Sequence, residues 1–177
     1  SGQGGCLYAG GNAVLTSTGF VGCSGMYGGG AWIVGNMMIN ASQFISNAAQ
    51  QNGGGAWTAG NVIINASQFT SNTAQSGGGA FIASTATISA SQFSRNTAQQ
   101  NGGGAAVYGS AMITASQFIS NMARYGGGAN VYVSGMFSGS QFISNAAAND
   151  GGGVRVAGYA ALCAATCTRD RARDGRG

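Results

Sequence analysis

The cysteines and aspartates are the residues of this chain best suited to covalent, metal-binding or acid–base chemistry. The four cysteines lie near the two ends of the chain, at Cys6, Cys23, Cys163 and Cys167. The sequence contains no His, Lys or Glu, and Asp150 is the only acidic residue before residue 169. Glycoside hydrolysis needs two facing carboxylates, and a Ser or Cys nucleophile needs a nearby base. We therefore expect no enzymatic activity and no catalytic residues.

The two cysteine pairs are too far apart in sequence, and too poor in other ligands, to predict a four-ligand metal site or any cofactor. Disulfides within the two ends are the preferred prediction, which implies an oxidising compartment. Cys6 would pair with Cys23, and Cys163 with Cys167. The second pair needs a turn rather than a strand, because only four positions separate its members. Free thiols at the ends are the alternative.

An internal repeat sets the elements that must position any site. GGG recurs at spacings of 25, 24, 25, 24 and 25 residues, from Gly28 to Gly151. Ser-Gln-Phe recurs in the same rhythm, and an Asn follows each Phe by three positions. The Phe column contains Phe44, Phe69, Phe93, Phe118 and Phe142. The Asn column contains Asn47, Asn72, Asn96, Asn121 and Asn145. Such a period is the signature of a solenoid.

Alternation of apolar and polar residues inside the unit has period two, which indicates strands rather than helices. We expect two or three short strands per coil, separated by bends. The fold class predicted is all-β, a right-handed parallel β-helix of about seven coils with 24–25 residues each. One apolar column should run from Ile39 through Ile64 and Ile88 to Leu162. A leucine-rich repeat is the weaker alternative, since the chain has three Leu in all.

The repeat also divides the chain. Residues 1–27 form a degraded N-terminal coil, residues 28–150 five regular coils, and residues 151–168 a C-terminal coil. Residues 169–177 are predicted to be a disordered, arginine-rich tail. The chain begins within the pattern at Ser1, so we interpret it as a segment of a longer protein.

The repeated columns predict structural roles. The GGG bends should bring neighbouring backbones together and require positive φ. The Phe rings should stack in the core, and the Asn side chains should turn inward as a hydrogen-bonded ladder.

The residue after GGGA is the most open candidate for binding. Trp32, Trp57 and Phe81 occupy it in successive coils, with Tyr108 and Tyr132 two columns further along. Asn and Arg at the same position in later coils predict that the column faces solvent. Stacked aromatic rings suit sugar rings or an apolar partner surface. The alternative is self-stacking that shields one edge of the rod, or docking against another part of a longer chain.

The small number and the placement of charged residues limit the kinds of partner that the chain can bind. Four of the seven Arg follow residue 168, so the body cannot neutralise a row of phosphates and nucleic acid is not an expected partner. No apolar run approaches the length of a membrane-spanning helix. Asn40 and Asn65 match the glycosylation sequon.

The alternation of GGGA with FISN, FTSN or FSRN resembles the repeat of chlamydial polymorphic outer membrane proteins, over roughly residues 28–150. The resemblance implies the secreted passenger of an autotransporter and a role in adhesion at the cell surface.

Our leading hypothesis is a secreted or cell-surface structural and adhesive rod that presents flat faces to a protein or glycan partner. A carbohydrate-binding β-helix that uses the aromatic stripe is the alternative. Ice binding ranks last, because Thr58, Thr70, Thr87 and Thr114 are scattered over different columns. The sequence does not define the oligomeric state.

Overall fold

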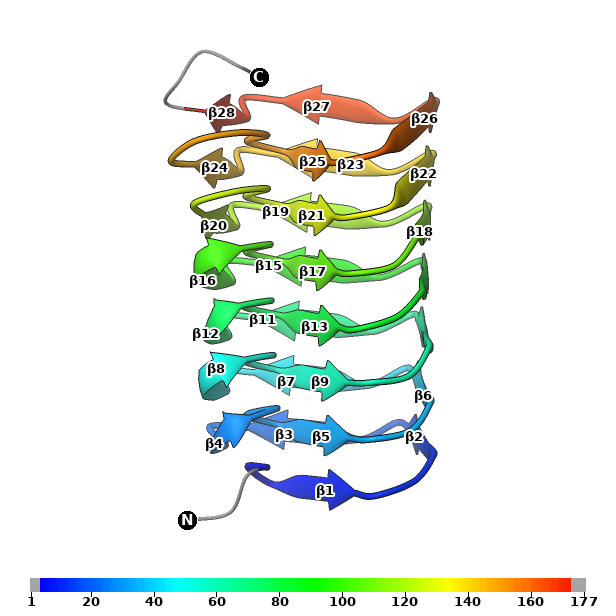
Figure 1. Ribbon diagram of the computed structural model, residues 1–177, viewed down its shortest axis with the longest axis vertical. Coiled ribbons are helices and arrows are strands. Elements are labelled where there is room, and N and C mark those ends of the chain that lie inside the picture. The colour runs from blue at the N-terminus through cyan, green and yellow to red at the C-terminus, as the bar shows by residue number, and fades with distance from the viewer. Residues whose placement is uncertain (1–3, 173–177) are drawn as a thin grey trace.

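A computed structural model describes residues 4–172 as a solenoid built entirely from short parallel strands. Figure 1 shows the coils stacked from the N-terminal end to the C-terminal end. Strands nearest the viewer run from left to right while the chain climbs, and those behind run back, so the solenoid is right-handed. The predicted fold class, a parallel β-helix of about seven coils, is confirmed.

Each coil contributes one strand to each of four parallel sheets, and each sheet has seven strands. The first sheet contains β1 (Leu7–Ala9), β5 (Ala31–Ile33), β9 (Ala56–Thr58), β13 (Ala80–Ile82), β17 (Ala105–Val107), β21 (Ala129–Val131) and β25 (Val154–Val156). The second contains β2 (Ala13–Thr16), β6 (Met37–Asn40), β10 (Val62–Asn65), β14 (Ala86–Ser89), β18 (Ala111–Thr114), β22 (Ser134–Ser138) and β26 (Tyr159–Cys163). The third contains β3 (Gly19–Val21), β7 (Gln43–Ile45), β11 (Gln68–Thr70), β15 (Gln92–Ser94), β19 (Gln117–Ile119), β23 (Gln141–Ile143) and β27 (Thr166–Thr168). The fourth contains β4 (Ser24–Tyr27), β8 (Ala48–Asn52), β12 (Thr73–Ser76), β16 (Thr97–Asn101), β20 (Met122–Ala123), β24 (Ala146–Ala147) and β28 (Arg171–Ala172).

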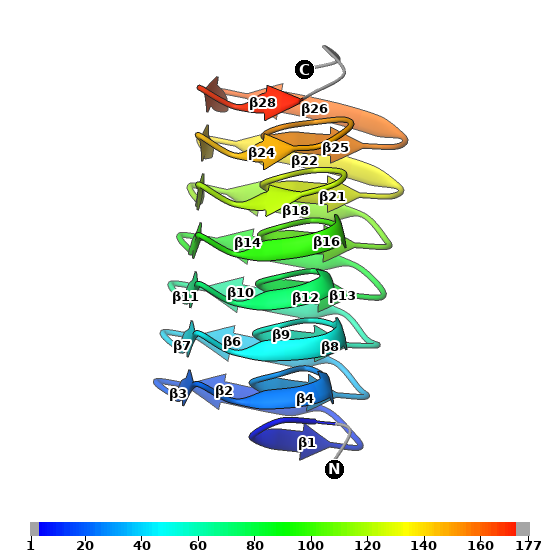
Figure 2. The same ribbon diagram turned by 90° about the vertical axis from the view of Figure 1, so that its left-hand side faces the viewer.

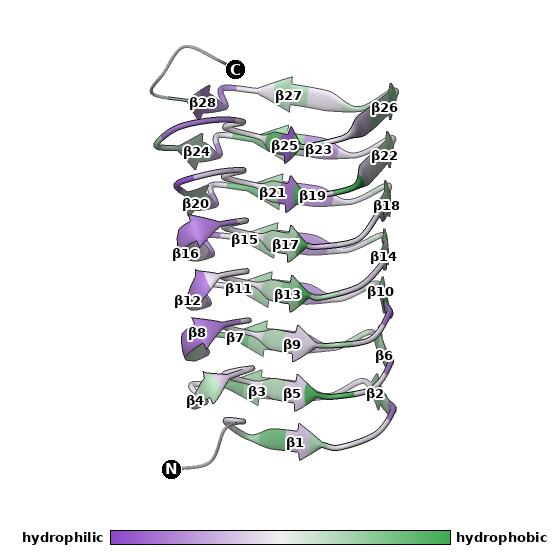
Figure 3. Ribbon diagram, in the orientation of Figure 1, coloured by the Kyte–Doolittle hydropathy of each residue, from purple (hydrophilic) through white to green (hydrophobic). Residues whose placement is uncertain are grey.

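Four strands per coil correct the expectation of two or three. The extra strand follows the Asn column, where the backbone turns at a residue with positive φ such as Ser46 or Ser71. Alternation alone does not reveal this corner, because the strands on either side are only two to five residues long. Figure 2 looks onto the fourth sheet that results. Its strands β8, β12 and β16 are largely purple, the hydrophilic colour, in Figure 3.

The C-terminal boundary also needs correction. The sequence predicts a tail from residue 169 onward, but β28 pairs in register with β24, with Arg171 opposite Ala146. The last coil therefore extends to Ala172. The remainder of the predicted tail, residues 173–177, lies outside the described residues.

The register places like residues above one another, as the repeat requires. Ile39, Ile64 and Ile88 are successive partners in the second sheet, and the column continues to Leu162 as predicted. At the GGG corner, Gly28 has a φ of 52°, and a Cβ on Gly29 would overlap the carbonyl oxygen of Gly54 in the next coil. Gly is required there for both reasons.

The Phe column lies at the centre of the core. The five rings from Phe44 to Phe142 are fully buried, and their centroids are 4.6 to 4.9 Å apart along the stack. In the first coil Phe20 continues the stack, 4.8 Å from Phe44. These rings contribute apolar burial and are not available to a ligand.

The Asn ladder is confirmed. Asn72 Nδ2 donates to Asn96 Oδ1 at 2.9 Å and to the Phe44 carbonyl oxygen at 2.9 Å. The same oxygen of Asn96 accepts the backbone N–H of Asn72 at 3.0 Å. This pattern repeats from Asn47 to Asn145, and all the Asn residues of the column are buried. Each side-chain amide therefore forms hydrogen bonds with both neighbouring coils.

Candidate functional site

The column after GGGA lies on the outer side of the first sheet, with Trp32, Trp57 and Phe81 in direct register. It is not the solvent-facing column that we expected. Phe81 is only 7% exposed, Asn130 is fully buried, and the two tryptophans are half-buried. A neighbouring part of each coil must therefore cover it.

That cover comes from the residues just before each GGG. The glycine corner turns the end of the fourth-sheet strand towards the column, so that the Tyr27 ring lies 5.7 Å from Trp32 and 6.0 Å from Trp57. Further along, Asn101 Oδ1 accepts a hydrogen bond from Asn130 Nδ2 at 3.1 Å, which explains how a polar residue is buried here.

A hollow of about 470 Å³ opens where this cover is incomplete, and it lies within the size range of ligand sites. We call it the aromatic hollow. It is lined by Tyr27, Trp32, Asn52, Trp57 and Phe81.

Aromatic rings continue from the hollow along the rod in both directions. Tyr8 lies 4.8 Å from Trp32, and Phe81 lies 5.0 Å from Tyr108. Tyr108 in turn stacks on Tyr132 at 4.3 Å. The structure thus joins all five aromatic residues singled out in the sequence and adds Tyr8 and Tyr27.

Of the two aromatic residues that the structure adds, Tyr8 could have been predicted from the repeat and Tyr27 could not. Tyr8 stands 24 residues before Trp32, in the same column, so the repeat contained the signal. Tyr27 belongs to the variable position before GGG, which carried no such signal.

Hydrogen-bonding groups in the hollow are neutral. Beside the hollow, burial raises the pKa of Tyr108 to about 12, with a further contribution from the adjacent Tyr132 phenol, so the Tyr108 phenol stays protonated. The Trp32 Nε1–H is buried and has no hydrogen-bond partner among the described residues. The first charged side chain of the sequence is Arg95. The site can therefore stack flat apolar groups and donate hydrogen bonds, and it has no group suited to acid–base catalysis.

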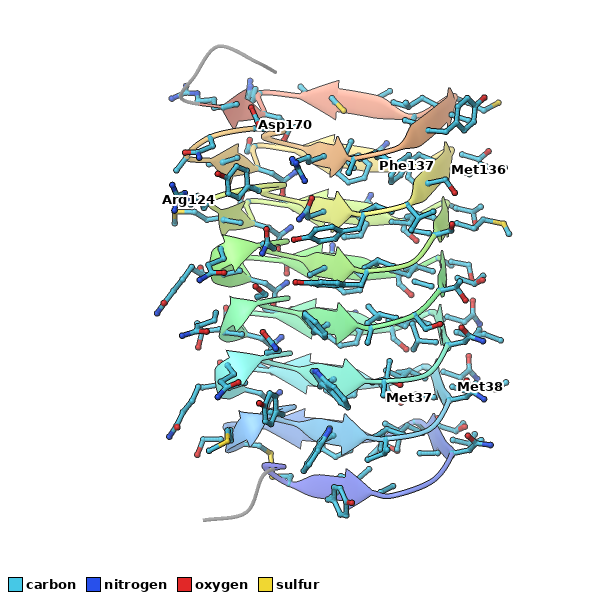
Figure 4. All side chains as sticks on the ribbon, in the orientation of Figure 1. Met37, Met38, Arg124, Met136, Phe137 and Asp170 are labelled. Carbon is cyan, nitrogen blue, oxygen red and sulfur yellow. A yellow bond between two sulfur atoms is a disulfide. The ribbon has the colours of Figure 1, made fainter. Side chains whose placement is uncertain are left out.

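A second surface, which sequence reasoning missed, lies on the outer face of the second sheet. We call it the apolar stripe. Its members occupy one outward column and are 43 to 69% exposed: Val14, Met38, Ile63, Met112 and Met136. Figure 4 shows Met38 and Met136 pointing away from the rod, whereas their neighbours Met37 and Phe137 point inward. The period-two alternation predicts the inward-facing residues of these strands. The same pattern also contains the signal for the outward column.

Polar residues border the apolar stripe. Asn40 and Asn65 stand in the adjacent outward column, where Asn65 Nδ2 donates to Asn40 Oδ1 at 2.9 Å. Their glycosylation stays a prediction. A smaller hollow of about 270 Å³ lies across the stripe at its C-terminal half, between Thr85 and Tyr159.

The cysteines take different states at the two ends. Cys6 and Cys23 form a disulfide that closes the first coil. Cys163 and Cys167 are free and exposed, so the second predicted pair is wrong. Cys163 follows Ser138 in an outward column, whereas Cys167 follows Phe142 in the inward one. The Cys163 side chain therefore starts outward from the second sheet and that of Cys167 inward from the third sheet.

Asp170 occupies the last position of the Asn ladder. Its Oδ1 accepts from the backbone N and the Nδ2 of Asn145, at 2.7 and 2.9 Å. Its Oδ2 is buried and without a partner among the described residues, at the place where earlier coils put an amide donor. Burial raises the pKa of this carboxyl group, although the hydrogen bonds from Asn145 lower it.

We expect Asp170→Asn to raise the melting temperature at neutral pH, by at most about 2–4 °C for a half-exposed group in a chain of this size. Because the folded-state pKa is raised, the stability that the protonated carboxyl supplies is present below about pH 3.9 and is lost as pH rises through the folded-state pKa. The gap between variant and parent should therefore close as pH falls towards about 4. Thermal melts of both proteins across this range test the prediction, and a gap that widens on acidification would contradict it.

The described residues contain no helix that is long and apolar enough to cross a membrane. In the same part of the chain, no group of three or more His, Cys, Asp or Glu side chains is placed to hold a metal ion. Comparison with protein-family models, with curated proteins and with solved structures finds no match to this chain.

Proposed function

We propose that the protein is a non-catalytic adhesive rod, secreted or displayed at a cell surface, which binds a partner through the flat outer face of its second sheet. The observation that carries this proposal is the apolar stripe. Five large apolar side chains lie exposed in one column of a seven-stranded sheet. At about 4.8 Å per strand, this sheet extends about 29 Å along the rod.

Exposed apolar surface of this regularity is typical of interaction sites. The outward columns of β2, β6, β10, β14 and β18 hold no charged residue, so a partner would not have to strip water from a charge. The rod also presents these side chains from a fixed backbone, because every strand is held by its neighbours in the sheet, so binding does not have to order the chain.

Two other observations support the proposed location of the protein outside the cytosol and its proposed role in adhesion. The Cys6–Cys23 disulfide is favoured in an oxidising compartment outside the cytosol. The GGGA and FxxN motifs resemble those of the chlamydial polymorphic outer membrane proteins, and the proposal of surface adhesion draws on that resemblance.

The test introduces charge into the stripe. We expect Met38→Lys combined with Ile63→Lys to weaken adsorption to an alkyl-coated sensor by about tenfold or more, because each side chain buries apolar surface on contact. The matched control is Gln43→Lys combined with Gln68→Lys, which adds the same charge to the same two coils on the third sheet. The control should adsorb like the parent. Equal adsorption by all three proteins, or equal loss in both variants, would show that the stripe is not the adhesive face.

A further inference from the structure

The aromatic hollow has features that the adhesive role of the second sheet does not use. It lies on a different sheet, between the outer column of the first sheet and the residues that precede GGG. Trp32 and Trp57 cross at 73°, whereas Trp57 and Phe81 are parallel to within 3°. The ring planes therefore change orientation between Trp32 and Trp57, two of the residues that line the hollow.

The unpartnered Trp32 Nε1–H identifies what an occupant must supply. A buried N–H group without a partner is costly, and native proteins generally satisfy such groups with protein, water or ligand. The occupant therefore offers a hydrogen-bond acceptor. Asn52, on the rim, offers both an amide donor and a carbonyl acceptor, so the occupant also gains from having hydroxyl groups.

Charge restricts the occupant further. No charged side chain occurs in the first 94 residues, which supply every residue that lines the hollow. An anionic or cationic ligand would lose hydration there with no ion pair in return. The occupant is therefore neutral, with a flat apolar face for the rings and hydroxyl groups for Trp32 and Asn52.

We propose that the aromatic hollow binds one sugar unit of a neutral oligosaccharide. The apolar ring face of the sugar packs against Tyr27, Trp32 and Trp57. One of its oxygens accepts the Trp32 Nε1–H after the indole turns towards the hollow, because this atom is covered in the unliganded structure. The chain continues along the rod axis, over Tyr8 in one direction and Phe81 and Tyr108 in the other. Tyr8 and Tyr108 are 58% and 42% exposed and are free to contact neighbouring units. This site is independent of the apolar stripe.

The two tryptophans of the protein both line the hollow, so selectively excited tryptophan fluorescence reports on it alone. We expect a linear neutral hexasaccharide of β-linked glucose, N-acetylglucosamine or xylose to change this fluorescence in a saturable manner. The same ligand should shift the indole N–H resonance of Trp32. Polygalacturonate, a charged chain, should cause neither change.

Two variants separate stacking from hydrogen bonding. Trp57→Ala should weaken binding more than tenfold, and Trp32→Phe, which keeps a ring but loses the N–H, by up to about tenfold. Both should fold, because the same column already holds Ala106 and Phe81. Tyr159→Ala, an exposed tyrosine on the second sheet, is the control and should bind like the parent.

Three outcomes would overturn the proposal. One is that none of the three hexasaccharides changes the fluorescence or the Trp32 resonance. Another is that Trp57→Ala and Trp32→Phe bind as tightly as the parent. The third is a response to an uncharged Leu- and Phe-containing peptide without any response to sugars, which would assign the hollow to a protein partner. None of these results bears on adsorption through the apolar stripe.

Discussion

Asn72→Leu should destabilise the rod by about 3–9 kcal/mol, the largest effect that we expect of any uncharged substitution. Leucine has nearly the same shape but removes both the acceptor and the donor of the ladder. The backbone N–H and Nδ2 of Asn47 lose their acceptor, and the Phe44 carbonyl oxygen loses its donor. All three groups are buried, and each unsatisfied group costs about 1–3 kcal/mol. The sum is a large part of the total stability of an ordinary domain.

Asn65→Leu is the matched control, because Asn65 lies in the same coil and also forms a ladder contact, to Asn40. That contact is exposed to water, and we expect its loss to cost about 0.5 kcal/mol or less. Urea unfolding followed by far-UV circular dichroism measures both variants. A midpoint of Asn72→Leu equal to that of Asn65→Leu would mean that the buried ladder does not hold the coils together.

Phe69→Asp should prevent the central coils from folding at neutral pH. Phe69 is fully buried between Phe44 and Phe93, whose ring centroids each lie 4.6 Å away. The substitution removes a large apolar side chain, at about 3–5 kcal/mol for truncation alone, and puts a carboxylate into the cavity. Each coil is stabilised mainly by its neighbours, so the defect interrupts the stack from the middle.

Gln68→Asp places the same charge on the adjacent residue of β11, whose side chain points to solvent. We expect this control to melt within a few degrees of the parent. Limited proteolysis and circular dichroism compare the two proteins. If Phe69→Asp resists proteolysis as well as Gln68→Asp does, the inward and outward columns of the third sheet have been assigned the wrong way round.

The sequence was sufficient to predict coil number, register and the inward columns. Two markers locked in phase fix which residues stand above one another, because parallel coils of nearly equal length leave no other pairing. Inward columns followed from the alternation, since Ile39 and Ile64 recur at positions where only apolar residues are tolerated. The Asn column was predicted because an amide can bond to the amide above and to free backbone groups at the same corner.

The candidate site was predicted less well, because it depends on the direction in which the glycine corner turns. Asn130 in the Trp32 column suggested exposure to solvent, but Asn101 and Arg155 satisfy its amide in a covered position. Tyr27 was missed for the same reason: nothing local in the sequence shows that the residue before GGG folds onto the column beyond it. The apolar stripe was not predicted because outward positions of a strand are ordinarily polar, and Thr87 interrupts the column between Ile63 and Met112.

The Asn ladder has a direction. Every Nδ2 donates to the coil on its C-terminal side, so the amide dipoles are parallel and add along the rod. The effect resembles the macrodipole of an α-helix, with its positive end at the last coil. An anion is stabilised at such an end, and the residue in that place is Asp170 rather than a sixth Asn. The core of this nearly uncharged rod is therefore electrically polar, and the dipole offsets part, but not all, of the cost of burying a carboxylate at its C-terminal end.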